Sequence, residues 1–188
     1  MTGYALCGSF CTHRRSLAVL RQLADSGTEL LPILSETAAA TDTRFGRAGE
    51  LIDELTKITG RTPVRHIVDA EPLGPQIPLD ALIIAPCTGN TLAKLACGIT
   101  DTTVCMAAKA HMRTSRPLLL ALATNDALSS NLENIACLLK RKNVFFVPLV
   151  QDDPRRKPHS LVADFALLPA ALEAMMRSEQ LLPLFRMP

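Results

Sequence analysis

Two runs of consecutive apolar residues constrain the fold of this chain more than any other feature. Ala81–Ala85 reads Ala-Leu-Ile-Ile-Ala, and Pro117–Ala123 reads Pro-Leu-Leu-Leu-Ala-Leu-Ala. A strand that is apolar at every position must be covered on both faces, as the strands of a parallel sheet are. Apolar runs over 4–8, 29–34 and 144–148 predict three further strands.

Segments with helical spacing separate these strands. The predicted helices span residues 13–25, 50–59, 91–97, 102–113, 131–140 and 160–177, the last bent near Pro169. Residues 35–44 and 72–78 have no regular pattern, and 151–159 is typical of an exposed loop. The alternation of strands and helices predicts a three-layer α/β fold with a doubly wound, Rossmann-like or flavodoxin-like parallel sheet.

The length of 188 residues is that of one domain, so we expect residues 1–188 to form a single unit. The C-terminal helical segment, about 160–182, is expected to pack on that unit or on a partner.

Composition excludes several classes of function. Twenty basic and 18 acidic residues give a net charge of +2, and the chain has one Tyr and no Trp. This balance does not favour nucleic acid or an anionic membrane surface as a partner. No apolar run reaches the ~20 residues that span a bilayer, and 4–8 is read as a strand rather than a signal peptide, so we expect a cytoplasmic protein. The six cysteines form no Cys-x-x-Cys pair, and no metal site is predicted.

Ligands of doubly wound sheets bind beyond the carboxyl ends of the strands, so the residues there are the candidate site. Gly8 and Ser9 follow the first strand and precede a helix, whose N-terminus favours an anion. Ser35 and Thr37 follow the second strand at the same edge. The same residue types are also typical of ordinary helix N-caps and turns.

The third strand end has the most specific pattern. Thr88, Asn90 and Thr91 come just after the buried strand and open a helix, and Gly89 lets backbone approach a ligand closely. Lys94, one turn into the helix, supplies a positive charge. Hydroxyls, an amide and backbone N–H groups are what a phosphate with a polyol chain requires.

The segment from Ala85 to Asp101 resembles the Ala-Pro-x-Ser-x-Asn-Thr-x-x-Lys-x-Ala-x-Gly-x-x-Asp signature of the flavoprotein family that includes the flavin-containing cysteine decarboxylases. The resemblance covers about residues 3–126. It implies a site for flavin mononucleotide (FMN) lined by Gly8, Ser9, Ser35, Thr37, Pro86, Cys87, Thr88, Asn90, Thr91, Lys94 and Asn125. It also implies a homo-oligomer, because such flavoproteins form trimers or dodecamers.

The chain departs from the decarboxylase pattern at three places. Those enzymes carry a His shortly before the Ala-Pro strand, and residues 70–78 contain none. Thr124 stands where they have a Met, and their late Cys-Gly segment is absent. Oxidative decarboxylation is therefore disfavoured, and the sequence assigns no catalytic residue.

The segments that depart from the decarboxylases resemble those of dipicolinate synthase B subunits: residues 43–46, 71–80, 124–128 and 151–163. This resemblance implies oxidation of dihydrodipicolinate to dipicolinate (pyridine-2,6-dicarboxylate) in the mother cell of a sporulating bacterium. It implies an A subunit of dipicolinate synthase as partner, through which NADP takes part. Arg44 and Lys157 are candidates for binding the carboxylates of the substrate, and solvated loop charges are the alternative.

Two other functions remain open at this stage. In the first, the chain is a non-catalytic binding or assembly subunit that keeps the flavin fold. In the second, it is an FMN-dependent decarboxylase. Fold alone does not decide among these readings, because unrelated functions share this architecture.

Overall fold

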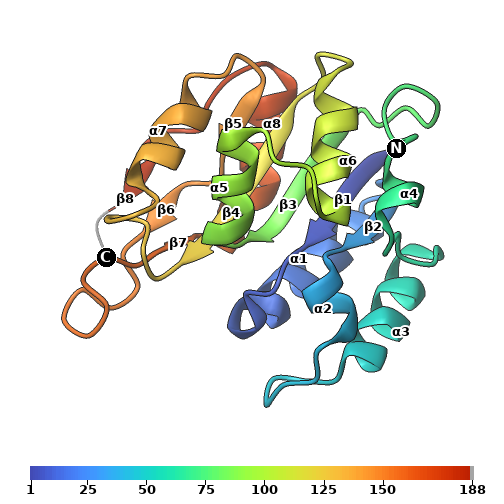
Figure 1. Cartoon of the computed structure of the whole chain (residues 1–188), viewed down its shortest axis with the longest axis horizontal. Coiled ribbons are helices and arrows are strands. Elements are labelled where there is room, and N and C mark those ends of the chain that lie inside the picture. The colour runs from blue at the N-terminus through green and yellow to red at the C-terminus, as the bar shows by residue number, and fades with distance from the viewer. Residues whose placement is uncertain (187–188) are drawn as a thin grey trace.

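The structure is a computed structural model that describes residues 1–186 (Figure 1). Within those residues, eight strands form one sheet. They are β1 (Thr2–Leu6), β2 (Leu30–Leu34), β3 (Ala81–Cys87), β4 (Leu118–Thr124), β5 (Val144–Phe146), β6 (Leu149–Val150), β7 (Leu161–Ala163) and β8 (Phe185–Arg186).

The helices alternate with the strands along most of the chain. They are α1 (His13–Asp25), α2 (Glu36–Ala40), α3 (Ala48–Thr59), α4 (Ile67–Ala70), α5 (Gly89–Cys97), α6 (Thr103–Met112), α7 (Leu132–Leu139) and α8 (Leu168–Met176), with short 3₁₀ helices at Phe10–Thr12 and Phe165–Leu167. None of the helices in residues 1–186 is long and apolar enough to cross a membrane.

The strand order explains where a ligand is expected. Strands β2, β1, β3, β4 and β5 are neighbours in that order and all parallel. The chain goes from β1 outward to β2 and then returns to β3 on the other side of β1. The topological switch point of this flavodoxin-like order therefore lies between β1 and β3. At the far edge β7 pairs antiparallel with the end of β4, and β6 and β8 extend the sheet.

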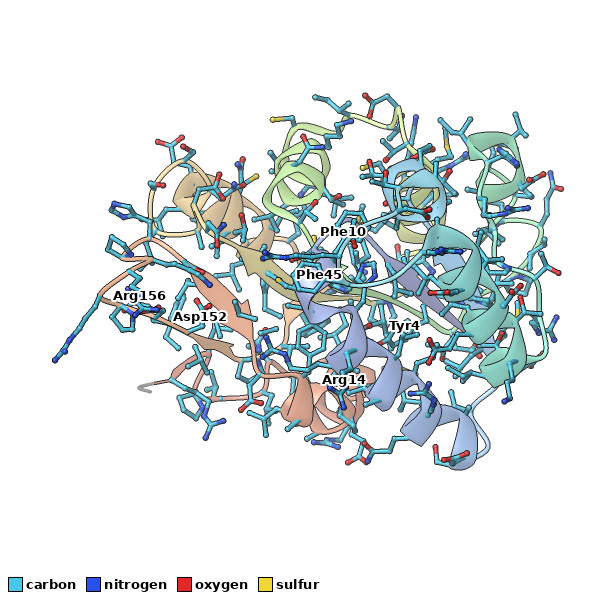
Figure 2. The ribbon with its side chains drawn as sticks, turned by 90° about the horizontal axis from the view of Figure 1, so that it is seen from below. Tyr4, Phe10, Arg14, Phe45, Asp152 and Arg156 are labelled. Carbon is cyan, nitrogen blue, oxygen red and sulfur yellow. The ribbon has the colours of Figure 1, made fainter. Side chains whose placement is uncertain are left out.

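Helices cover both faces of this sheet. Figure 2 shows α1 and α8 on one face and α5 and α7 on the other, and the contacts between α1 and α8 and between α5 and α7 agree. The predicted three-layer, doubly wound α/β fold is confirmed.

The two apolar runs form the centre of the core. Every residue of β3 is buried, and the first six residues of β4 are buried as well. Full burial of a Leu or Ile side chain stabilises the fold by about 1.5–3 kcal/mol, so these strands carry much of the stability. Tyr4 is also fully buried, and its hydroxyl donates to the carbonyl of Ser16 at 3.0 Å, which satisfies the one polar atom of that side chain.

The predicted helix over 160–177 is wrong in its first part. Leu161–Ala163 is strand β7, because its backbone pairs with the end of β4 and with β6. Pro169 causes no bend inside a helix, because it stands in the first turn of α8. A backbone N–H in that turn would have no acceptor within the helix, so proline loses no hydrogen bond there. Residues 35–44, read as irregular, contain α2, whereas 151–159 is a largely exposed loop as predicted.

Gly74 is a position where only glycine fits. Its φ is +101°, and a Cβ there would lie 2.6 Å from the carbonyl oxygen of Ala110 on α6. Gly27 also has a positive φ, +83°, but nothing lies within 4 Å of its Cβ position.

The two glycines should therefore differ in the cost of a side chain. We expect Gly27→Ala to lower the free energy of unfolding by about 1 kcal/mol through backbone strain, and Gly74→Ala by about 1–3 kcal/mol more, because α6 must also shift. Urea unfolding of both variants measures this difference, and equal losses would contradict it.

His111 predicts a loss of stability in mild acid. Its side chain is buried on α6, Nε2 donates to the carbonyl of Pro117 at 2.8 Å, and Nδ1 has no partner. Burial lowers the pKa of His111 below its ordinary value of 6.5, against the raising effect of that hydrogen bond. Below about pH 6.5 the unfolded chain therefore binds a proton at this imidazole more readily than the folded protein does. The free energy of unfolding decreases as the pH is lowered.

We expect the free energy of unfolding to fall by up to about 1.4 kcal/mol per pH unit from this group between pH 6.5 and 5. His111→Gln should make that fall shallower, and the exposed His66→Gln should leave it unchanged. Urea unfolding across this pH range tests the prediction, which fails if all three proteins show one slope.

Candidate functional site

The loops that follow β1, β2, β3 and β4 meet at one edge of the sheet. The backbone N–H of Cys7 donates to the carbonyl of Pro86 at 3.1 Å, and the Ser9 hydroxyl donates to the carbonyl of Ala123 at 3.3 Å. A Cβ on Gly8 would lie 3.2 Å from the methyl group of Thr37. The structure therefore brings Gly8, Ser9 and Thr37 together, as expected for parallel strands.

The end of β2 is organised around a helix cap and a carboxylate. The Ser35 hydroxyl accepts the N–H of Ala38 at 3.2 Å and so caps α2. Glu36 accepts the N–H of Thr103 at 2.8 Å and its hydroxyl at 2.7 Å. The N-terminus of α6 is thus already neutralised by a carboxylate of the protein, which leaves the N-terminus of α5 as the better place for an anion.

Thr88 occupies the N-cap of α5. Its hydroxyl accepts the N–H of Thr91 at 3.2 Å and lies 3.0 Å from the Thr91 hydroxyl, which donates in turn to the Cys7 sulfur at 3.3 Å. Thr88 is half-buried, Thr91 is buried and Asn90 is exposed. The first turn of α5 leaves the N–H groups of Gly89 and Asn90 without helical acceptors, next to this hydroxyl pair.

Gly89 is required by packing. A Cβ there would lie 2.5 Å from the Thr124 hydroxyl and 2.6 Å from the Asn131 amide nitrogen. Thr124 in turn donates to the carboxylate of Asp126. Close contact between α5 and the loop after β4 accounts for this glycine, whereas the sequence had suggested close approach of a ligand.

Lys94 is held by an ion pair. Its ammonium lies 2.8 Å and 2.9 Å from the two carboxylate oxygens of Asp101. This hydrogen bond is the main cause that raises the pKa of Lys94, and it also holds the pKa of Asp101 below its usual range. A phosphate that binds Lys94 must therefore share its ammonium with Asp101.

Two thiols beneath the strand-end loops, those of Cys7 and Cys87, are buried and favour the protonated form. Burial raises the pKa of Cys7 to about 12, against the lowering effect of the Thr91 hydrogen bond, and it raises the pKa of Cys87 well above its usual range. Pro86 and Cys87 are buried residues of β3, and the exposed fraction of Cys87 is 0%. They lie beneath the strand-end loops and do not stand on the surface that a ligand would meet.

The remaining predicted residues are exposed and lie in three loops. Asn125 is exposed in the loop after β4. Arg44 is exposed on the Thr43–Gly46 turn, with its guanidinium 4.8 Å from the centre of the Phe45 ring. Lys157 pairs with Asp152 at 3.0 Å in the 151–159 loop. Figure 2 shows Phe45 near Phe10, and Asp152 well to one side.

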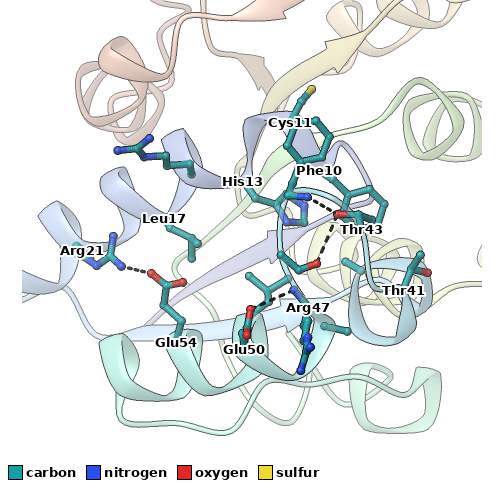
Figure 3. Close-up of a pocket in the computed structure, with 16 residues that line it drawn as sticks. Phe10, Cys11, His13, Leu17, Arg21, Thr41, Thr43, Arg47, Glu50 and Glu54 are labelled. Atoms are coloured by element: carbon teal, nitrogen blue, oxygen red, sulfur yellow. Dashed lines mark hydrogen bonds and ion pairs between the residues drawn. The ribbon is translucent and has the colours of Figure 1, made fainter.

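A pocket between α1, the Thr43–Gly46 turn and α3 was missed by the sequence analysis (Figure 3). This α1–α3 pocket has a volume of about 480 Å³. Its walls include Phe10, His13, Leu17, Thr43, Phe45 and Leu51. The sequence signal that could have indicated this pocket is the pair of aromatic residues, Phe10 and Phe45, in two loops at the carboxyl edge.

His13 forms part of the wall shared with the strand ends. Its Nε2 donates to the carbonyl of Cys7 at 2.8 Å. Burial lowers the pKa of His13, and the hydrogen bond opposes that effect. The imidazole is therefore neutral at physiological pH, with Nε2 protonated and Nδ1 free to accept.

Sequence comparison identifies the family. A model described as Flavoprotein matches residues 3–172. The chain belongs to the flavoprotein family. Within this family, the dipicolinate synthase B subunit of Bacillus subtilis (strain 168) is 43% identical over 182 residues, which are 97% of this chain and 91% of that protein. The predicted family is therefore confirmed.

Solved structures of flavoproteins share the fold. The crystal structure of the dipicolinate synthase B subunit from Bacillus halodurans C superposes with a TM-score of 0.90 at 41% identity, covering 98% of this chain and 95% of that one. DmrB from Burkholderia xenovorans, solved with FMN and described as a cubic protein cage for redox transfer, gives a TM-score of 0.69 at 20% identity, with 94% and 95% covered. The second likeness shows the fold alone.

The six thiols should fall into two classes of reactivity. Cys11, Cys97 and Cys137 are exposed, and Cys7, Cys87 and Cys105 are buried with raised pKa values. Because the thiolate is the nucleophile, we expect a disulfide reagent such as DTNB to modify three thiols of the native protein quickly at pH 8 and all six in denaturant. Fast modification of more than three native thiols would contradict the packing around the strand ends.

Proposed function

We propose that this chain acts as a flavin-fold subunit of a dipicolinate synthase, together with an A subunit, in the oxidation of dihydrodipicolinate to dipicolinate during sporulation. The observation that carries the proposal is the 43% identity to a B subunit over 97% of the chain. The alignment spans 182 of the 188 residues, so the similarity extends over nearly the whole chain.

The strand-end residues fit a phosphate with a polyol chain. The hydroxyls of Ser9 and Thr88 and the N–H groups of Gly89 and Asn90 stand in the loops that follow β1 and β3, beside the switch point between these strands. Lys94 supplies a positive charge one turn further into α5. We propose that these groups, with Gly8, Ser35, Thr37, Thr91 and Asn125, hold FMN. When bound, FMN supplies a ring that accepts or donates a hydride.

The chain's own residues bind and orient in this proposal. The buried Cys7 and Cys87 stay protonated, and Lys94 is engaged by Asp101. The two thiols pack beneath the site and Lys94 contributes charge beside it, and none of the three is poised to move a proton at neutral pH. The lack of a proton-transferring group among these three residues favours a second candidate function. In it, this chain is a non-catalytic binding or assembly protein, and its A-subunit partner carries NADP and performs the hydride transfer.

The proposed setting follows from the relative. We propose that the chain works in the cytoplasm of the mother cell of a sporulating bacterium, and the name of the related B subunit implies a partner subunit. Homo-oligomerisation is proposed by analogy with flavoproteins such as DmrB, whose structure is a cage.

Reconstitution separates the two candidates. The purified A subunit and this chain are mixed with dihydrodipicolinate and NADP, and dipicolinate formation is followed with each protein omitted in turn. We expect little product from the A subunit alone and at least a tenfold gain on adding this chain. Undiminished oxidation without this chain would favour the assembly role, and no product from the pair would refute the proposed pathway step.

Retention of FMN tests the strand-end site. We expect the protein to retain added FMN through ultrafiltration, with its visible absorption, and Thr88→Leu to lower the affinity at least tenfold by removing the hydroxyl and crowding the α5 cap. Thr62→Leu, at an exposed threonine away from the strand ends, is the matched control and should bind like wild type. Equal retention by both variants would place the flavin elsewhere.

A further inference from the structure

The α1–α3 pocket has the size and walls of a small-molecule site. Its volume of about 480 Å³ lies within the range of about 300–1,000 Å³ that ligand pockets occupy. The rings of Phe10 and Phe45 and the side chains of Leu17 and Leu51 give it apolar walls. Figure 3 shows Phe10 and His13, from the loop after β1 and the start of α1, facing Thr43 on the opposite turn. Such walls suit a flat, partly apolar ligand.

The turn that closes one side of the pocket is fixed by its own hydrogen bonds. Thr43 and Gly46 exchange backbone bonds of 3.0 Å and 3.2 Å, and the N–H of Phe45 donates to the Thr43 hydroxyl at 3.1 Å. The tip of the turn therefore presents Arg44 and Phe45 in a set arrangement. Phe45 is 54% exposed although it lines the pocket, and the Arg44 guanidinium stacks on its ring at 4.8 Å. An ordered pair of this kind offers a ring surface beside a cation.

Charge at the mouth of the pocket favours an anion. Arg14 and Arg47 line the pocket, and Arg44 stands beside it over the Phe45 ring. None of these three guanidinium groups forms an ion pair within residues 1–186. Three carboxylates lie in or next to the walls: Glu54 pairs with Arg21, and Glu50 and Asp42 accept the backbone N–H groups of Arg47 at 3.3 Å and Ala48 at 2.9 Å. Arg14, Arg21, Arg44 and Arg47 outnumber these three carboxylates by one, so the mouth carries a net positive charge. A guanidinium can pair a carboxylate with two parallel hydrogen bonds.

The pocket shares a wall with the strand-end site. The edge of the Phe10 ring lies 3.6 Å from the Cβ position of Gly8. Ala38 lines the pocket, and its N–H is bound by Ser35. A ligand in the pocket would thus lie next to whatever occupies the loops after β1 and β2.

We propose that the α1–α3 pocket binds a small planar dicarboxylate, with Arg44 pairing one carboxylate and Phe45 packing against the flat face of the ring. The identity of that dicarboxylate, a pyridine-2,6-dicarboxylate or its dihydro form, rests on the proposed function. The location rests on the pocket, the turn and the charges alone.

The test measures binding of pyridine-2,6-dicarboxylate to the full-length protein by isothermal titration calorimetry, with FMN retention measured in parallel. Arg44→Gln and Phe45→Ala should each weaken the dicarboxylate about tenfold or more and leave FMN retention unchanged. Arg61→Gln is the control for loss of an exposed arginine, and Phe185→Ala is the control for loss of a phenylalanine of similar exposure, 53%. Both controls should bind like wild type.

Three outcomes would overturn the inference. If the wild-type protein does not bind the dicarboxylate at millimolar concentration, the pocket is not a dicarboxylate site. This holds whether or not the protein retains FMN and supports turnover with the A subunit. Equal affinity in the Arg44 and Phe45 variants and their controls places the ligand elsewhere. Normal affinity combined with lost turnover in the two variants makes the turn a contact for the A subunit instead.

Discussion

The burial of β3 on both of its faces is the constraint on which the rest of the structure depends. A strand without an exposed residue tolerates a polar side chain only where a partner satisfies it, so most polar groups of the parallel sheet gather beyond its strand ends. The two neighbours of β3 are buried as well: β1 at every residue, and β4 over its first six residues. The hydrogen bond from Cys7 to Pro86 ties two of these strands together at the edge where the loops begin.

The polar groups at that edge are engaged before any ligand arrives. Ser35 and Thr88 cap helices, Lys94 is paired with Asp101, and Glu36 fills the N-terminus of α6. These bonds fix the loops in advance, so that little conformational entropy remains to be lost on binding. A cofactor would then be recognised largely by backbone N–H groups at α5 and by hydroxyls that can accept a second hydrogen bond.

Much of the fold and the sheet edge could be predicted from the sequence, because apolar runs and helical spacing are local signals. Helix α1 begins and ends at the predicted residues, and the loops after β1 and β2 meet as expected. β7 was missed because Leu161–Ala163 is too short to show a period, and only its pairing with β4 makes it a strand. The engagement of Lys94 by Asp101 and the α1–α3 pocket depend on which side chains meet across elements, and one sequence does not reveal that.

Amide hydrogen exchange with and without FMN tests most directly the central claim, that the strand-end loops form the flavin site. A bound ligand slows exchange where it contacts or orders backbone N–H groups. We expect added FMN to protect segments 8–13, 35–41, 88–94 and 124–128 together, and to leave 26–29, the loop before β2 at the opposite edge of the sheet, unchanged. Absence of protection at 88–94, or protection confined to other segments, would contradict a flavin site at the switch point between β1 and β3.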